Sequence, residues 1–198
     1  MPVCHSLLAD ASLWRHLLRL DEQVAAAARR AGCPHCQGVL HGARYPRKVF
    51  GVAHGVLGEG YDSRLSFCCA REGCRRRTTP ESVRFLGRKA FPGALVLLVC
   101  ALTQDLSRRR RAELGARLGV SERTLERWRQ WWRSTLPATP WWRTARARFV
   151  PPPEAQALPS SLLACCGVTT SAAALVAALQ FLAPCSLSSF PAPPERAA

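Results

Sequence analysis

Residues 33–36 read Cys33-Pro34-His35-Cys36, and residues 68–74 read Cys68-Cys69-Ala70-Arg71-Glu72-Gly73-Cys74. The first stretch places two thiols on one tight turn, and the second supplies another pair further along the chain. Two such turns that face each other form a tetrahedral metal site. We therefore predict a structural Zn²⁺ site with the ligands Cys33, Cys36, Cys69 and Cys74.

The spacing of the second pair does not decide which residue is its first ligand. Four residues separate Cys69 from Cys74, whereas two are commonest in zinc knuckles, so Cys68 or His41 could replace Cys69. Short β-compatible runs among Gly and Pro residues predict a small zinc ribbon over residues 33–80. Few large apolar side chains occur there, so we expect the metal to supply folding energy and not catalysis. The alternative is a set of unrelated cysteines.

A second motif covers residues 111–128, which read RAELGARLGVSERTLERW. Ser121 is placed to cap the second of two short helices. The apolar and small residues fall where two crossed helices and the turn between them would meet: Leu114, Gly115, Leu118, Gly119, Val120, Leu125 and Trp128. This pattern predicts a helix-turn-helix. The alternative is an ordinary helical hairpin with a charged outer face.

The second helix of this motif would turn several polar side chains outward. Arg123 and Arg127 lie one helical turn apart, so both could enter a major groove, where Arg reads guanine through two hydrogen bonds. Thr124 and Gln130 could contact bases or phosphates. Contacts with the phosphate backbone are expected from two arginine runs: Arg75, Arg76 and Arg77, and Arg108, Arg109, Arg110 and Arg111. For the first run the alternative is a solvated basic face.

The charge of the chain favours a polyanionic partner. The 198 residues include 28 Lys and Arg against 13 Asp and Glu, a formal net charge of +15. Between Arg44 and Arg148 there are 23 basic and 8 acidic residues, so this central part holds the whole excess. Apolar residues make up 48% of the chain, which is enough for a core and argues against global disorder.

Periodicity and breaker residues predict a mainly α protein with a small β zinc ribbon. Helices are expected at 10–30, 91–106, 109–118, 121–134 and 140–149, and as one helix or a pair within 158–183. A Ser- and Pro-rich tail from Pro184 is expected to be disordered. The four predicted parts are an N-terminal amphipathic helix (1–32), the ribbon (33–80), a helical domain with the helix-turn-helix (81–150) and a Pro-bounded helical segment with the tail (151–198).

Two stretches bear on the location of the protein. The apolar residues 162–183 include Thr169, Thr170, Ser171 and Gln180 and lack basic flanks, so we expect a buried helix and not a membrane span. Residues 1–9 lack the basic region and cleavage site of a signal peptide. Paired cysteines in a reducing compartment are metal ligands, and we expect a cytoplasmic, nucleoid-associated protein.

The order of these motifs resembles the N-terminal DNA-binding part of bacterial insertion-sequence transposases. The resemblance covers residues 30–150, from the Cys-Pro-x-Cys turn through the second cysteine pair and its arginine run to the helix-turn-helix. It implies recognition of the terminal DNA of an element, with ribbon and helix-turn-helix each touching the duplex. Beyond position 126 only Glu154 and Glu195 are acidic, so the carboxylate triad of a transposase is missing. The chain thus resembles a stand-alone accessory or regulatory product of such an element, or a domesticated remnant.

Together these features predict a zinc-dependent, sequence-preferring protein that binds double-stranded DNA and is not an enzyme. A transposase or a second copy of the chain is a further expected partner, and no small-molecule substrate is expected. One alternative is a ribbon-containing adaptor whose Trp-rich and C-terminal helices dock on a larger transposase or polymerase. Another is an RNA-binding ribbon protein.

Overall fold

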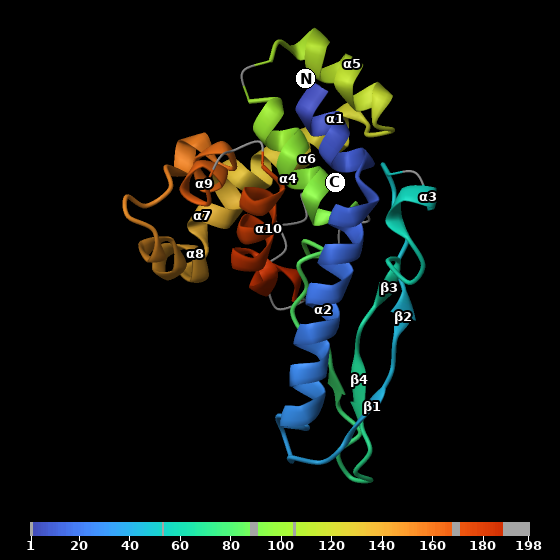
Figure 1. Cartoon of the computed structure of the whole chain (residues 1–198). Helices are drawn as coiled ribbons and strands as arrows, with labels where there is room; N and C mark the ends of the chain where they lie inside the picture. Colours follow the sequence, from blue (N-terminus) through green and yellow to red (C-terminus); the bar gives the residue numbers. More distant parts are fainter. Residues whose placement is uncertain (1, 53, 88–90, 105, 168–170, 188–198) are drawn as a thin grey trace, which may run out of the picture.

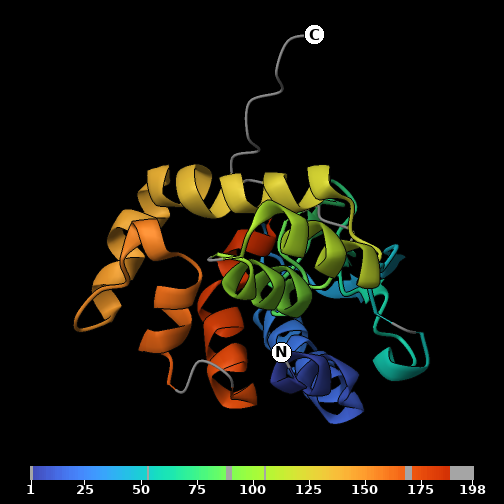
Figure 2. The ribbon, with the colours of Figure 1, turned by 90° about the horizontal axis from the view of Figure 1, so that it is seen from above.

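The computed structural model of the chain describes all residues except 1, 53, 88–90, 105, 168–170 and 188–198. The described part is mainly helical with small antiparallel sheets, as predicted. The long helix α2 (Ala11–Ala31) has strands beside its C-terminal half and shorter helices around its N-terminal half (Figure 1). Seen from above, α1 (Pro2–Ala9) and α2 lie at the edge of this helical body (Figure 2).

Helix α2 confirms the predicted amphipathic helix and its two ends. The Asp10 carboxylate caps it by accepting a hydrogen bond of 2.8 Å from the backbone N–H of Ser12. Gly32 ends it with a positive φ of 77°. The N-terminal half buries Trp14 in the main core, and the C-terminal half buries Ala25 in a smaller core under the sheet. One helix therefore joins both cores.

The described residues between 33 and 80 include five short strands. Leu40, Leu65 and Phe67 form the smaller core together with Ala25 and buried cysteines. Helix α3 (His54–Leu57) follows the second strand. The strands β1 (Leu40–Gly42), β4 (Phe67–Cys69) and β5 (Arg77–Thr78) form an antiparallel sheet in the order β1-β4-β5, and β2 (Tyr45–Pro46) pairs with β3 (Ser63–Arg64).

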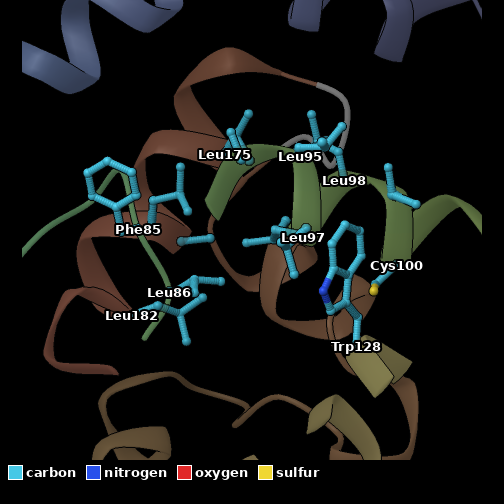
Figure 3. Packing of buried hydrophobic residues seen from close by; sticks show 14 of the residues in the cluster. Phe85, Leu86, Leu95, Leu97, Leu98, Cys100, Trp128, Leu175 and Leu182 are labelled. Carbon is cyan, nitrogen blue, oxygen red and sulfur yellow. The ribbon is translucent and has the colours of Figure 1, made fainter. Parts of the chain in front are cut away.

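Helix α4 (Gly93–Leu102) is the centre of the helical body, and its residues from Gly93 to Cys100 are buried on all sides. Figure 3 shows Leu97 of this helix beside Trp128, with Leu175 on the far side of the cluster. The elements after α4 are α5 (Arg108–Arg117), α6 (Glu122–Gln130), a π-helical turn (Trp131–Thr135), α7 (Leu136–Ala138), α8 (Pro140–Ala145), α9 (Ser160–Cys165), α10 (Ala172–Phe181) and 3₁₀ turns at Arg146–Arg148, Ala155–Ala157 and Ala183–Ser186.

The C-terminal segment folds back on the helical body. The predicted helix pair is α9 and α10, whose Leu162 and Leu179 are buried in the main core. The expectation of a disordered tail from Pro184 is wrong at its start, because Cys185 and Ser186 are buried in a 3₁₀ turn; residues 188–198 lie outside the described part. Among the described residues, no helix combines the length and apolarity that a membrane crossing requires.

The main core takes residues from all four predicted parts of the chain. Leu17 comes from the first part, Leu57 from the second, Leu97 from the third and Leu179 from the fourth. The segment 33–80 and the helical body are therefore packed against each other through residues of one core.

A buried ion pair connects α2 with the segment that leads from the sheet to α4. Asp21 Oδ2 lies 2.7 Å from Arg84 Nε, and the two side chains are 1% and 0% exposed. The same carboxylate accepts hydrogen bonds from the Ser82 hydroxyl and the Val83 backbone N–H. The Arg84 guanidinium also donates to the carbonyls of Gly60, Tyr61 and Ser63. Because α2 and the sheet both contribute partners, this network holds the ribbon region in place.

Candidate metal centre and nucleic-acid interface

Four cysteine sulfurs converge at the end of the sheet. The Sγ atoms of Cys33, Cys36, Cys69 and Cys74 all lie within 4.8 Å of one another. Cys33 Sγ lies 3.7 Å from Cys74 Sγ, and Cys36 Sγ lies 3.4 Å from Cys69 Sγ. Sulfurs bound to a tetrahedral zinc ion at about 2.3 Å would be about 3.8 Å apart. All four are free thiols and not disulfides, so the cluster fits a metal ion.

Two similar turns present these sulfurs. After Cys36 the chain passes through Gln37 with a φ of 59°, and after Cys74 it passes through Arg75 with a φ of 46°. The Arg71 backbone N–H donates to Cys69 Sγ at 3.4 Å, which stabilises a negative charge on that sulfur. The local fold therefore directs a backbone N–H at one sulfur of the cluster.

Close contact of the two turns depends on Gly38. A Cβ at this position would lie 3.2 Å from Cys69 Sγ and 3.3 Å from Cys36 Sγ. Such distances are tighter than ordinary van der Waals contact, so a larger residue would push the sulfurs apart. Gly38 thus allows one sulfur from each turn to approach the other.

The thiols differ in their affinity for protons. The Gly38 backbone N–H is the main cause that lowers the pKa of Cys36 from an ordinary 9.0 to about 7. Burial raises the pKa of Cys69 to about 12. A metal ion must displace protons from such thiols in order to bind, so occupancy of the cluster depends on pH.

The alternative ligands Cys68 and His41 do not belong to the cluster. Cys68 Sγ points to the Arg75 carbonyl oxygen at 3.3 Å. Cys68 and Cys69 are neighbours in strand β4, so their side chains point to opposite faces of the sheet. His41 is paired with Cys68 in the β1–β4 register and is exposed. The alternation of the strand therefore selects Cys69.

The arginine run that follows the cysteines lies at the same end of the sheet. The side chains of Arg75, Arg76 and Arg77 are exposed. Arg76 Nη1 lies 3.1 Å from His35 Nδ1, so it joins the two cysteine turns. The Arg71 guanidinium donates to the Cys36 carbonyl at 3.4 Å. Sequence reasoning did not assign Arg71 to this basic group, although its position between two ligands was a usable signal.

Helices α5 and α6 cross closely, and small residues make this possible. A Cβ on Gly115 would lie 2.6 Å from the Val120 carbonyl oxygen and 2.9 Å from Leu125 Cδ1. Gly119 forms the turn between the helices with a φ of 64°. Val120 fills the corner with 3% of its surface exposed. The crossing therefore follows the residue pattern of the predicted motif.

The outer face of α6 carries the predicted polar residues. Arg123, Arg127 and Gln130 are exposed, whereas Leu125 and Trp128 are buried. Ser121 caps α6 by accepting a hydrogen bond of 3.3 Å from the Thr124 backbone N–H.

Thr124 is half-buried and is held on this face by local hydrogen bonds. Its hydroxyl accepts from Arg127 Nη2 at 3.3 Å and from the Ser121 hydroxyl at 2.9 Å. The Arg127 side chain is thus directed toward the N-terminal end of α6, where it donates to the Thr124 hydroxyl.

An open groove of about 440 Å³ lies between the first turn of α5 and one side of α6. Arg108 pairs with Glu122 across it at 2.8 Å, and both side chains are largely exposed. Such a pair contributes little to stability and can exchange partners. Arg109 pairs with Glu113, and Arg110 is exposed. The groove is lined by Arg108, Arg111, Glu122, Arg123, Leu125, Glu126 and Arg129. Arg111 belongs to the arginine run identified in the sequence, whereas sequence reasoning missed Arg129.

The two groups of predicted site residues lie at opposite ends of α2. The cysteine cluster adjoins its C-terminal end, and α5 lies beyond its N-terminal end (Figure 1). Helix α2 has 21 residues and is therefore about 30 Å long. Comparisons of the chain with protein-family models, curated proteins and solved structures find no match. The geometry of these two sites is therefore the basis for assigning a function.

Proposed function

We propose that the protein binds double-stranded DNA with a preference for certain sequences. The observation that carries this proposal is the close crossing of α5 and α6, which leaves Arg123 and Arg127 exposed on one face of the second helix. A helix held in this way can enter the major groove as the second helix of a helix-turn-helix. Arg123 and Arg127 would contact bases, and Thr124 and Gln130 would contact bases or phosphates.

The arginines at the start of α5 support a role in binding phosphate. Helix α5 has no acidic residue in its first turn and instead begins with Arg108, Arg109 and Arg110. Positive charge at a helix N-terminus opposes the helix dipole and destabilises the free protein. A bound phosphate backbone would offset this repulsion. The exposed Arg75, Arg76 and Arg77 would provide a further backbone contact at the other end of α2.

Zinc is the metal that the cysteine cluster fits best. Four sulfur ligands in a tetrahedral arrangement are typical of structural zinc sites. When bound, the ion would join the turns at Cys33 and Cys36 to those at Cys69 and Cys74 and so stabilise the sheet. Because no coordination position is left for water or substrate, the proposed role is structural, and we propose a binding protein and not an enzyme.

The proposal includes a role in a mobile element, as an accessory or regulatory protein that acts in the cytoplasm on the nucleoid. It rests on the order of cysteine turns, arginine run and crossed helices that resembles the DNA-binding part of insertion-sequence transposases. A transposase or a second copy of the chain would be the protein partner. The C-terminal helices give little support to the adaptor hypothesis, because Leu162, Leu163 and Leu179 are already buried in the chain's own core.

Selection from randomised duplexes tests the proposal. The zinc-loaded protein is incubated with the pool over a salt series, and the retained DNA is sequenced. We expect one enriched motif and steep salt dependence. Retention of duplex in competition with single-stranded RNA separates DNA binding from the RNA alternative. Salt-sensitive retention without enrichment, or preference for RNA, would contradict the proposal.

The variant Arg127→Ala tests the role of α6. Loss of a bidentate base contact should cost about 1–3 kcal/mol for the selected motif and relax discrimination at one position. Arg143→Ala is the matched control, since Arg143 is an exposed arginine on α8 and belongs to neither site. If both variants show the same sequence preference as the wild-type protein, α6 does not read the bases.

A further inference from the structure

A loop of the sheet region lies beside the crossed helices and carries two exposed residues that the proposed function does not use. We infer that this loop, residues 47–51, extends the DNA-binding surface of α5 and α6. Lys48 contacts a backbone phosphate, and Phe50 packs against the sugar or base edge of the adjoining nucleotide. The inference rests on the proposed function and adds a specific contact to it.

The loop is held in place on both sides of Lys48. The Arg47 guanidinium donates to the Gly87 carbonyl at 3.4 Å, so Arg47 points inward. Val49 is 8% exposed and belongs to the main core. Lys48 and Phe50 alternate with these two anchors and are therefore directed outward; both are exposed. The positions of the two side chains follow from packing and not from a free loop.

Gly51, the last residue of the loop, lies against the C-terminal end of α5. Gly51 has a φ of 83°, and a Cβ there would lie 3.4 Å from the carbonyl oxygen of Leu118. Leu118 is the C-cap residue of α5. The Phe50 ring lies 5.9 Å from the Phe91 ring, which lies 5.0 Å from the ring of Trp128 on α6. The loop therefore lies against the C-terminal end of α5 and is linked to α6 through Phe91.

The chemistry of the two exposed residues fits a nucleic-acid backbone. Phe50 is 51% exposed and is one of few large apolar side chains that face solvent among the described residues. Two cationic side chains are exposed in the same region: Lys48, which lies two residues before Phe50, and Arg117 at the end of α5. An apolar ring among cations is poorly suited to an apolar protein surface, but it can lie against a sugar or base while the cations bind phosphates.

Two variants of the zinc-loaded full chain separate these contacts. Lys48→Gln should weaken binding to all sequences alike and reduce the slope of log affinity against log salt concentration by about 0.9, the value for one phosphate. Phe50→Ser should weaken binding with the salt slope unchanged, because no charge is lost. The controls are Arg143→Gln on α8 and Val150→Ser, whose side chain is 97% exposed.

A direct contact is measured by placing a photoreactive phenylalanine analogue at position 50 and, as a control, at position 150. We expect cross-linking to duplex DNA from position 50 only. Equal cross-linking from both positions, or an unchanged salt slope in Lys48→Gln, would overturn the inference. If Arg127→Ala nevertheless loses discrimination, the proposed function stands without the loop. If the original protein does not bind DNA at all, both fail.

Discussion

The buried ion pair between Asp21 and Arg84 leads to the sharpest prediction about stability. Replacing Asp21 with Ala removes a carboxylate that accepts from Arg84 Nε at 2.7 Å, from the Val83 N–H at 2.7 Å and from the Ser82 hydroxyl. It leaves the Arg84 guanidinium, which is 0% exposed, with backbone carbonyl oxygens and the Tyr61 and Phe85 rings as neighbours but with no negative charge to pair with among the described residues. Such a buried and unpaired charge typically costs about 3–5 kcal/mol.

This cost is large compared with the stability of an ordinary domain, which is about 5–15 kcal/mol. Urea unfolding of the zinc-loaded protein, followed by tryptophan fluorescence and by circular dichroism, measures it. The matched control is Glu22→Ala, the next residue on α2, whose side chain is exposed. A surface change of this kind should alter the free energy of unfolding by less than about 0.5 kcal/mol.

A double variant distinguishes the unpaired charge from a general loss of packing. Asp21→Leu combined with Arg84→Met removes both charges, and it should be more stable than Asp21→Leu alone. The reasoning is refuted if Asp21→Ala is no more destabilising than Glu22→Ala. It is also refuted if the free energy of unfolding falls in the double variant by the sum of the decreases in Asp21→Leu and Arg84→Met, since the two side chains would then act independently.

Three further predictions concern the metal site and the crossed helices. Cys36→Ser should lose the bound zinc ion and destabilise the sheet, whereas Cys68→Ser should keep one zinc per chain; elemental analysis and urea unfolding measure both. Zinc retention, followed with a colorimetric chelator, should fall as the pH is lowered, because protons compete for the thiolates. The Cys36 pKa of about 7 in the metal-free protein means that this sulfur accepts a proton only as the pH approaches neutrality. Gly115→Ala should destabilise by about 1–3 kcal/mol, because its Cβ would lie 2.6 Å from the Val120 carbonyl oxygen, whereas Gly42→Ala, with no atom within 4 Å, should cost less.

Local patterns were sufficient to predict several elements of the structure. Helix α2, capped by Asp10 and Gly32, lies close to the predicted bounds of 10–30, and Ser121 caps α6 as predicted. These predictions succeed because a capping group and its partner lie within a few residues of each other. The π-helical turn at Trp131–Thr135 was not predicted, because a change of helical register depends on how the tryptophans pack and not on the local sequence.

The cysteine site shows where sequence information ends. The residue types and their pairing in turns were sufficient to predict a tetrathiolate cluster, but Cys68 and Cys69 were both candidates. The register of β1 and β4 selects Cys69, because adjacent residues in a strand face opposite sides. The pairing of β4 with β1 therefore decides between Cys68 and Cys69, which the sequence alone leaves as equivalent candidates.

The sequence by itself determined the helical segments, the presence of paired thiols suited to a metal ion, the crossing of α5 and α6 and the location of the positive charge. These features depend on contacts between residues that are near in the chain or on residue type. Only the tertiary structure showed that Asp21 neutralises Arg84, that Gly51 lies against the end of α5 and that the basic groups lie at opposite ends of α2. Each of these brings together residues far apart in the chain, and such contacts depend on the packing of the whole core.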